Sequence, residues 1–515
     1  MSENQYSAEA ELVKRITGAE QIKETHISYA LLTDDYVYKI KKPVDFGFLD
    51  YRLLKSRRSY CILEKELNDR FSKDVYLEVL KVVHQSKEKF ALVPVENSLP
   101  AIEYVLKMKR IKDSDFLASR ISAGNIDYSQ MVNIGAQVAN LLINLENAPK
   151  DEDFKEPYDS VRFNAVENFN QTEKYKNIFI DSASFEFIKN KTLNFLEDNR
   201  ELFNSRAVQG FIKNGHGDLR LDHIYFNADG TVGLIDCIEF NRRFRYIDVI
   251  AEAAFLSMEL DMSGKTDFSD CFIEGFLSVF SDENTVKLLN YYRSYLAYVR
   301  AKVTCFLVDG KDKEWELYSV KTEEISRLID LSAYYALNME SVITPVFYGL
   351  MGTGKSKNAK MFSARFPVSH INSDEVRKKD AGVASTEKLY NKFDEGVYSH
   401  ENSIKVYEKM ANITLEKGRL GRSCVIDASF TKESYLNTFI SVGIENLKFY
   451  QFTAPEEIIL SRLNGRLSKD VVSDGRPEIY FAQKESAKMP KPDFVIVTTQ
   501  SVSKNVEKIF KTLIK

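Results

Sequence analysis

A short glycine-rich segment constrains what this chain can fold into more than any other feature. It follows the apolar run 344–348 and reads Gly349-Leu-Met-Gly352-Thr353-Gly354-Lys355-Ser356. The glycines allow the backbone to turn so tightly that successive N–H groups can point at one anion, and a helix beginning after them adds its positive end. A strand, a glycine loop and a helix in this order are typical of a parallel α/β sheet. We therefore predict a phosphate-binding loop in the last third of the chain.

The polar residues of this loop predict its ligand. Lys355 supplies a mobile ammonium for the β- and γ-phosphates of a nucleotide, and Ser356 supplies a hydroxyl for Mg²⁺. The phosphates would be surrounded by the backbone of Gly349, Gly352, Thr353 and Gly354. The loop thus predicts ATP and Mg²⁺ as ligands, and the alternative is a glycine-rich turn that binds nothing.

Two aspartates downstream extend this candidate site. Asp374 follows a second apolar run and lies one helical turn before Arg377, where the two side chains can hold a hydroxyl and an anionic group. The alternative is that Ser373 and Asp374 only cap a helix. Asp427 ends another apolar run, where a carboxylate can reach the metal ion or its waters. The alternative for Asp427 is a strand-end carboxylate in an ordinary turn.

Two arginines near the C-terminus are candidates for a lid. Arg462 and Arg466 fall on one predicted helix, and the polar segment 468–476 follows them. Guanidinium groups that close over phosphates stabilise the transferred charge. We take Arg466 as the catalytic candidate, and the alternative for either residue is an ordinary surface arginine.

A second phosphotransfer signature lies upstream, in the β-rich segment 216–238. Asp218 and Asp236 are 18 residues apart, and each lies beside an apolar strand. A kinase needs one aspartate to orient the acceptor hydroxyl and accept its proton, and another carboxylate to hold Mg²⁺. A hairpin with Asp218 on its leading loop and Asp236 at its trailing end provides both groups.

Lys39 is the cation that would accompany this pair. It lies within the β-rich run 36–41, and a buried lysine requires an acidic partner. The helix predicted over 51–70 offers Glu64 or Glu66, and we favour Glu64. The alternative is an exposed lysine on an edge strand, since Lys41 lies on the same face of the run.

Length and pattern divide the chain. At 515 residues it is too long for one ordinary domain. Short β-rich runs dominate 1–110, helical periodicity dominates 111–340, and strands alternate with helices in 341–515. We expect these to be the two lobes of one domain and a separate P-loop domain, so the predicted fold class is a two-module α/β protein.

Composition disfavours several classes of function without excluding a local basic groove. The net charge of −4, from 71 basic and 75 acidic residues, gives no electrostatic footprint for nucleic acid. The five cysteines show no CxxC spacing, which disfavours a structural zinc site and fits a reducing cytosol. The N-terminus lacks the features of a signal peptide, and no apolar run reaches the ~18 residues of a membrane span. We expect a soluble, cytoplasmic protein.

The segment 343–515 resembles small P-loop kinases of the zeta-toxin, polynucleotide-kinase and gluconokinase type. The order of motifs carries the resemblance: the P-loop, Ser373-Asp-Glu-Val-Arg377, Ile426-Asp-Ala-Ser429, a lid arginine and Ser473-Asp474. It implies a parallel sheet and transfer of the ATP γ-phosphate to a hydroxyl. Asp374 would then bind or deprotonate that hydroxyl.

The N-terminal half resembles aminoglycoside phosphotransferases and choline-kinase-like enzymes, through His216-Gly-Asp218-Leu and Ile235-Asp236. The resemblance implies a bilobal protein-kinase-like (α+β) fold, with Asp218 as catalytic base and Asp236 as metal ligand. Lys39 would meet the α- and β-phosphates, and the backbone of the strand 103–110, at Met108, would meet adenine.

One position departs from that family. Five residues after the base the family has an asparagine as second metal ligand, and this chain has His223. A neutral imidazole can ligate a metal ion but suits Mg²⁺ poorly. Either Asp236 holds the metal almost alone, or this half has weak or altered activity. We also expect Glu239 and Asp248 to brace the loop below the metal, with Asp248 paired to a nearby arginine among Arg242, Arg243 and Arg245.

Nearly the whole chain, over 20–335 and 343–515, is similar to bacterial fusion proteins described as bifunctional aminoglycoside phosphotransferase/ATP-binding proteins. The expectation is two ATP-dependent kinase modules that act on small hydroxylated molecules. One alternative is an N-terminal pseudokinase that senses a ligand and controls the C-terminal kinase. Another is a polynucleotide 5′-kinase, which the nearly neutral charge disfavours. The sequence predicts neither the acceptor nor the oligomeric state.

Overall fold

The structure is a computed structural model that describes residues 6–47, 49–86, 89–149, 157–280, 282, 284–384, 395–465 and 476–514. Contacts divide the chain into two compact units. The first comprises Met1–Ser160, Phe203–Leu256 and Gly275–Phe280, and the second Val161–Leu202, Ser257–Glu274 and Ser281–Lys515. The second unit thus joins several helices of the middle region to the P-loop region. The three domains predicted above were divided by the pattern of expected helices and strands rather than by contacts, and their boundaries stay a prediction.

The first unit contains a six-stranded antiparallel sheet in the order β1-β2-β3-β6-β4-β5. Its strands are β1 (Gln21–Glu24), β2 (Ser28–Leu32), β3 (Tyr36–Lys41), β4 (Tyr76–Ser86), β5 (Lys89–Pro94) and β6 (Glu103–Lys109), and its helices are α1 (Ala8–Thr17) and α2 (Leu54–Asn68). Successive side chains of β3 point to opposite faces. Ile40 packs against α1, whereas the flanking Lys39 and Lys41 both bind Glu64 of α2. The helices α1 and α2 therefore cover opposite faces of the sheet.

Helices and two short antiparallel ribbons follow the sheet. The helices are α3 (Leu117–Ser122), α4 (Tyr128–Ile143), α5 (Pro157–Thr172), α6 (Ser182–Asp198), α7 (Arg200–Val208), α8 (Arg242–Arg245), α9 (Val249–Met262), α10 (Thr266–Leu277), α11 (Thr285–Val308) and α12 (Tyr318–Leu337). The ribbons pair β7 (Ile212–Asn214) with β10 (Tyr246–Asp248) and β8 (Ile224–Phe226) with β9 (Val232–Leu234). They position the loops 215–223 and 235–241. None of the described helices is long and apolar enough to cross a bilayer.

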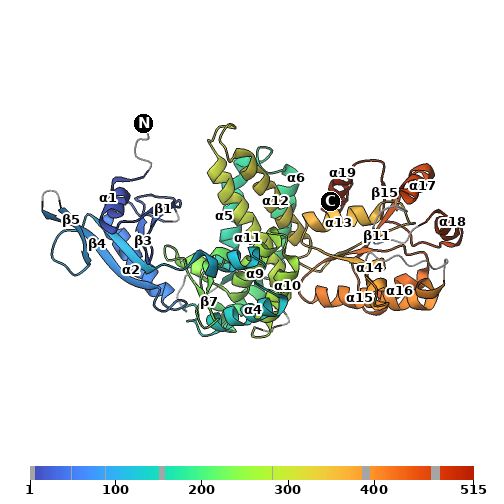
Figure 1. The fold of residues 1–515 in the computed structure, drawn as a ribbon, viewed down its shortest axis with the longest axis horizontal. Coiled ribbons are helices and arrows are strands. Elements are labelled where there is room, and N and C mark those ends of the chain that lie inside the picture. The colour runs from blue at the N-terminus through green and yellow to red at the C-terminus, as the bar shows by residue number, and fades with distance from the viewer. Residues whose placement is uncertain are drawn as a thin grey trace. The chain divides into compact units, whose positions relative to one another are not determined.

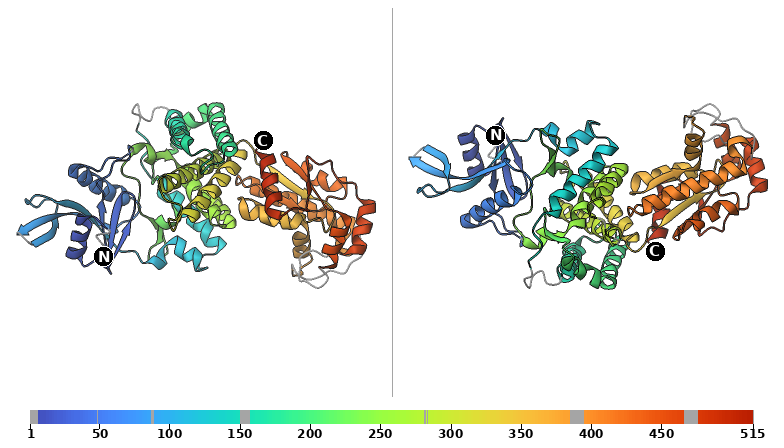
Figure 2. Two further views of the ribbon diagram at one scale, coloured as in Figure 1. Left: turned by 90° about the horizontal axis from the view of Figure 1, so that it is seen from above. Right: turned by 90° about the horizontal axis from the view of Figure 1, so that it is seen from below.

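The P-loop region is a five-stranded parallel sheet in the order β12-β13-β11-β14-β15. Its strands are β11 (Thr344–Tyr348), β12 (Ser369–Asn372), β13 (Cys424–Asp427), β14 (Leu447–Thr453) and β15 (Phe494–Val497). Its helices are α13 (Lys355–Arg365), α14 (Ser373–Asp380), α15 (His400–Gly418), α16 (Glu433–Ser441), α17 (Glu456–Asn464), α18 (Pro477–Ser486) and α19 (Val502–Leu513). The strand order reverses at β11, so the loop after β11 opens at the switch point where ligands bind in such sheets. Figures 1 and 2 show α13 and α19 on one face of the sheet and α15 and α16 on the other.

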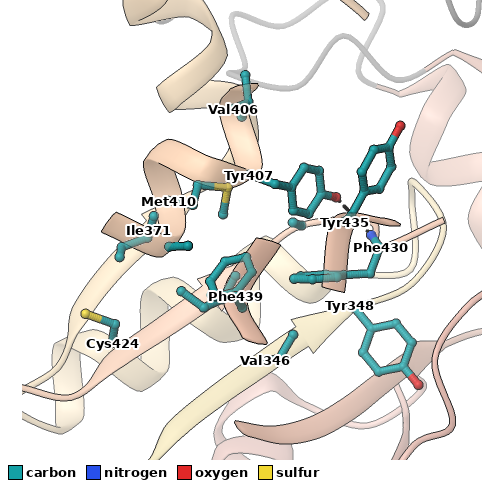
Figure 3. Close-up of a cluster of buried hydrophobic side chains, with 13 residues drawn as sticks. Val346, Tyr348, Ile371, Val406, Tyr407, Met410, Cys424, Phe430, Tyr435 and Phe439 are labelled. Carbon is teal, nitrogen blue, oxygen red and sulfur yellow. Dashed lines mark hydrogen bonds between the residues drawn. The ribbon is translucent and has the colours of Figure 1, made fainter. Parts of the chain in front are cut away.

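A buried cluster holds α15 and α16 against the sheet (Figure 3). The rings of Tyr407 and Tyr435 stack with centroids 4.4 Å apart. The Tyr407 hydroxyl accepts the backbone N–H of Phe430 at 3.0 Å, which fixes the chain just after β13. Every residue of the central strand β11 is buried, as a strand covered on both faces requires. The predicted fold class is confirmed at the level of its layout: an α+β region built on an antiparallel sheet precedes an α/β domain built on a parallel sheet.

Within the second unit, one arginine fastens the P-loop sheet to the helices before it. Arg422 precedes β13 and is 1% exposed. Its guanidinium donates to Asp261 and Asp270, at 2.9 and 2.7 Å, and to the hydroxyl of Ser269 at 3.0 Å. Burial opposes its charge, but Asp261 and Asp270 hold the pKa of Arg422 well above its usual range. The strand that ends at Asp427 is thereby anchored at its other end.

We expect the Arg422→Met variant to unfold at a lower denaturant concentration, with a loss of about 3–5 kcal/mol, because it leaves Asp261 and Asp270 buried with their arginine removed. The control is Lys409→Met, which removes the exposed ion pair with Asp380 and should change the free energy of unfolding by less than about 1 kcal/mol. Guanidinium denaturation of both variants measures this. Equal midpoints would contradict a structural role for Arg422.

Candidate active sites

The P-loop conformation depends on its glycines. Gly349 has φ 140°, and a Cβ there would lie 2.4 Å from the carbonyl oxygen of Phe452 at the end of β14. Gly354 has φ 94° and immediately precedes Lys355, the first residue of α13. A residue with a side chain is strained at both positions. The predicted strand, glycine loop and helix are therefore present, and the amide end of α13 opens at the loop.

The backbone of the loop is held by side chains from distant elements. The Thr353 hydroxyl donates to the Leu350 carbonyl at 2.8 Å, and the Thr498 hydroxyl donates to the Thr353 carbonyl at 2.7 Å. Arg462 of α17 donates to the carbonyls of Gly352 and Thr498, at 3.3 and 2.8 Å. Arg462, which the sequence places in a lid, thus braces the loop in this structure. Only the fold brings α17 and the end of β15 beside the loop.

Asp427 lies at the carboxyl end of β13 and is fully buried. Its Oδ2 accepts hydrogen bonds from Asn372 and from Nε2 of His370, whereas its Oδ1 has no partner among the described residues. Burial by itself raises the pKa of Asp427, but His370, Lys355 and Ser356 lower it below its usual value. The carboxylate is thus ionised, with one oxygen uncommitted.

These donors fit the metal predicted for the site. The Ser356 hydroxyl and the free oxygen of Asp427 are oxygen ligands, which Mg²⁺ prefers, and Mg²⁺ completes its shell with waters and phosphates. The described residues include no group of three or more His, Cys, Asp and Glu arranged to hold a metal ion. A site made of one carboxylate, one hydroxyl and phosphate oxygens does not need such a group. His370 and Asn372, which orient Asp427, received no role from the sequence.

Asp374 is the second residue of α14, which directly follows β12. Strand β12 pairs with β13, the strand that ends at Asp427. The helix is capped by Asn372, whose side chain accepts the N–H groups of Asp374 and Glu375 at 2.9 and 3.1 Å. The alternative that Ser373 and Asp374 cap the helix is therefore wrong. Arg377 is buried and donates to the carbonyl of Val397 at 2.7 Å. Asp374 as the acceptor-binding residue stays a prediction, and Arg466, Ser473 and Asp474 lie outside the described residues.

The upstream site is organised around Lys39. Its Nζ lies 2.7 Å from Oε1 of Glu64 and 2.8 Å from Oδ1 of Asp236. Burial opposes its charge, but Asp236 and Glu64 hold the pKa of Lys39 well above its usual range. Glu66 is exposed, so the predicted pairing of Lys39 with Glu64 is confirmed. The alternative of an exposed edge-strand lysine is wrong, because β3 lies between β2 and β6.

Asp236 is held in an unusual backbone conformation. Its φ is 63°, and its N–H donates to the hydroxyl of Tyr76 at 2.9 Å. Burial alone would raise its pKa, but Lys39 and His223 hold the pKa of Asp236 well below its usual range. Its side chain remains 39% exposed, which leaves a carboxylate able to meet a ligand.

The loop that carries Asp218 is fixed from below by Glu252 of α9. Oε1 of Glu252 accepts the N–H groups of His216 and Gly217, at 2.5 and 2.9 Å, and its buried Oε2 has no partner among the described residues. Nε2 of His216 donates to the Ile235 carbonyl at 2.7 Å, so Nδ1 can accept the N–H of Asp218. Burial lowers the pKa of His216 to about 3. A neutral histidine therefore braces the loop together with Glu252, which gave no signal in the sequence.

His223 contacts Asp218 rather than standing alone. Its Nδ1 lies 2.7 Å from the Asp218 carbonyl and 3.6 Å from Oδ2 of the same residue. Donation from Nδ1 to the carbonyl leaves Nε2 as the possible ligand atom. Its metal-binding role stays a prediction. Asp248, expected to pair with a neighbouring arginine, instead forms a buried ion pair with Arg206 at 2.6 Å.

Met108 lies in β6, paired with Val37 of β3 and Tyr76 of β4. Its side chain belongs to a buried cluster to which Val37 and Ile235 add partly buried surfaces. The N–H groups of the next two residues are already bonded, to the carbonyls of Val75 and Asp35. Apolar surface suited to a flat base is thus present, and contact of adenine with the Met108 backbone stays a prediction.

Comparisons with known sequences match both parts of the chain. Residues 345–488 match the family model described as an AAA domain. A curated protein of Mycobacterium bovis (strain ATCC BAA-935 / AF2122/97), described as uncharacterized, is 29% identical over 415 residues, which cover 79% of this chain and 78% of that protein. A protein of Mycobacterium tuberculosis (strain ATCC 25618 / H37Rv) matches to the same extent.

Two solved structures are similar to parts of this chain. A gluconokinase from Sinorhizobium meliloti 1021 is 16% identical with a TM-score of 0.25, over 33% of this chain and 91% of that one. An amicoumacin kinase in complex with AMP-PNP, Ca²⁺ and Ami is 10% identical with a TM-score of 0.39, over 63% of this chain and 94% of that one. Both are similarities of fold.

Glu252 should make the stability of the protein depend on pH. Burial raises the pKa of its carboxyl from 4.5 to about 7. Between these values the unfolded chain has lost the proton that the folded chain keeps, so stability falls as pH rises through this window, by about 3 kcal/mol, and is level above it. We expect Glu252→Gln to lack this fall. Urea denaturation of both proteins at about pH 5 and about pH 8 measures the difference.

Glu201→Gln serves as the control for this experiment, because Glu201 is exposed on α7. It should follow the wild type at both pH values. If the wild type and Glu252→Gln changed in parallel with pH, Glu252 would not be the titrating group.

Proposed function

We propose that this protein is an ATP-dependent phosphotransferase with two kinase modules, each of which transfers the γ-phosphate to a hydroxyl of a small molecule. The observation that carries the proposal is the convergence of Lys355, Ser356 and Asp427, whose Oδ1 is buried without a partner among the described residues. An uncommitted buried carboxylate oxygen near a P-loop serine suits a metal–nucleotide site. Composition predicts a cytoplasmic location.

At the C-terminal site, the loop amides and the start of α13 would bind the phosphates. Mg²⁺ bound there would neutralise charge on the β- and γ-phosphates. Lys355 balances the charge of the transferred group. His370 and Asn372 donate to Oδ2 of Asp427 and so leave its Oδ1 available to a ligand. We assign to Asp374 the binding of the acceptor hydroxyl and acceptance of its proton.

At the N-terminal site, Asp218 would accept the proton of a second acceptor, and Lys39 would bind phosphate oxygens. Asp236 is the residue that would hold Mg²⁺, since it is ionised and partly exposed. Glu64 holds Lys39 in place. Glu252, His216 and His223 hold the loop that bears Asp218.

A specific observation favours a second candidate for the N-terminal half. His223 occupies the position where related enzymes have a metal-binding asparagine, and its Nδ1 is engaged by the Asp218 carbonyl. A site that retains Lys39 and Asp236 but has lost a metal ligand can bind nucleotide without transferring phosphate. The N-terminal half would then sense a nucleotide and control the P-loop kinase.

We expect Lys355→Ala to lower transfer by the C-terminal site by at least about 100-fold, because charge on the transferred phosphoryl group is left unbalanced. Lys360→Ala is the matched control, since Lys360 is exposed on the same helix. The measurement is transfer of labelled γ-phosphate to sugars, sugar acids, aminoglycosides and 5′-hydroxyl RNA. Transfer to RNA alone would favour the polynucleotide kinase, and equal activity of both variants would refute the assigned role of Lys355.

The Lys355→Ala protein also isolates the N-terminal site. We expect it to bind Mg²⁺–AMP-PNP once per chain by calorimetry and to retain transfer to one class of acceptor. Asp218→Asn in this background should abolish that transfer and leave binding nearly unchanged, because only the proton acceptor is removed. Binding without any transfer in the Lys355→Ala protein would favour the nucleotide-sensing alternative.

A further inference from the structure

A second buried lysine lies two residues after Lys39, on the same face of β3. Lys41 is 3% exposed. Its Nζ is 2.7 Å from Oε2 of Glu64 and also binds Oε1 of Glu239. Burial opposes its charge, but Glu239 and Glu64 raise the pKa of Lys41. The phosphotransfer chemistry described above gives this lysine no role.

Lys41 completes the coordination of Glu64. One carboxylate oxygen of Glu64 binds Lys39 and the other binds Lys41, and Glu64 itself is 1% exposed. If Glu64 turned away from Lys39, the buried Lys41 would lose its hydrogen bond to Glu64. Removing one partner from a buried ion pair is strongly unfavourable, so the second lysine holds the first pair closed.

The same lysine reaches the loop that carries Asp236. Glu239 lies three residues after Asp236 and also accepts the hydroxyl of Tyr51 at 2.6 Å. A chain of contacts therefore runs from Asp236 through Lys39, Glu64 and Lys41 to Glu239. Two ammonium groups face three carboxylates, and the carboxylate exposed most is Asp236.

An independent contact ties α2 to the same loop. Asn68, in the last turn of α2, accepts the N–H of Cys237 at 3.0 Å and is fully buried. Helix α2 is thus tied to the loop 236–239 at two positions one turn apart, directly at Asn68 and through the two lysines at Glu64.

We propose that Lys41 is a positioning residue that keeps Glu64 on Lys39, so that the N-terminal site is assembled before a nucleotide binds. In protein kinases the position of the helix bearing this glutamate is a point of control. Here Lys41, through which a movement of that helix would have to pass, is buried and bonded to both Glu64 and Glu239. Helix α2 is a fixed part of the site, and control of this half must act elsewhere. The proposal rests on the function proposed for Lys39.

Hydrogen exchange of the full-length protein tests this. In the wild type, amides of Leu54–Asn68 should exchange slowly, and Mg²⁺–AMP-PNP should change their rates by less than about twofold. The test variant is Lys41→Met/Glu239→Gln, which removes a cation and an anion together and so avoids an unpaired buried charge. Its α2 amides should exchange at least about tenfold faster without nucleotide and slow again with nucleotide.

Two further variants sharpen the result. Tyr51→Phe removes only the hydroxyl donated to Glu239 and should speed exchange in α2 by a smaller factor, of about threefold. Lys42→Met is the control, because Nζ of Lys42 binds Glu24 and the Thr25 carbonyl outside this network. Its α2 amides should match the wild type. Exchange in Lys355–Arg365 of the P-loop domain should be unaffected in all variants.

Two outcomes would overturn the proposal. One is slowing of α2 exchange by nucleotide, by about tenfold or more, in the wild type. The other is unchanged α2 exchange in the double variant. Failure of the proposed function looks different: the Lys355→Ala protein would bind no nucleotide by calorimetry, while the nucleotide-free comparison of wild type and double variant would still decide whether Lys41 fixes α2.

Discussion

An ionised side chain in the interior of a protein must be paired with a group of opposite charge. The tertiary structure of this chain depends on two networks of such buried ion pairs. In the first unit, Lys39 and Lys41 share Glu64 and extend to carboxylates on the loop 236–239. In the second, Arg422 lies between Asp261 and Asp270. Each network joins segments that are far apart in the sequence, so each fixes tertiary structure as well as charge.

The two networks differ in whether they include residues of a candidate site. Lys39 and Asp236 belong to the proposed N-terminal site, so the first network includes residues with a proposed chemical role. Arg422 contacts no candidate ligand group, but it anchors β13, and Asp427 ends that strand. In the P-loop domain the candidate metal-binding carboxylate, Asp427, is therefore positioned by its strand. In the N-terminal half the corresponding candidate, Asp236, is positioned by a loop and by the side chains around it.

The two candidate sites also differ in which of their polar groups already form hydrogen bonds within the protein. Asp427 has one buried oxygen without a partner among the described residues, which suits a metal ion held jointly with phosphate. Around Asp218, in contrast, the backbone is already bonded to Glu252, His216 and His223. His223 in particular is used to hold the loop.

Local sequence determined much of this protein. The glycines and Lys355 fix the loop after β11, and the apolar runs locate the strands that end at Asp427 and before Asp236. The sequence limited the partner of Lys39 to Glu64 or Glu66, and the structure confirmed the favoured Glu64. The loop and the strands follow from backbone sterics and from residue spacing within one element. Tertiary structure alone decided which distant side chains contact the site residues. In the first unit, Glu239 binds Lys41 and Glu252 binds the loop that carries Asp218. In the second, His370 and Asn372 bind Asp427, and Arg462 binds the P-loop. These partners come from elements that are distant in sequence, and the pairing of a buried charge is specified by where the chain folds rather than by the residues beside it.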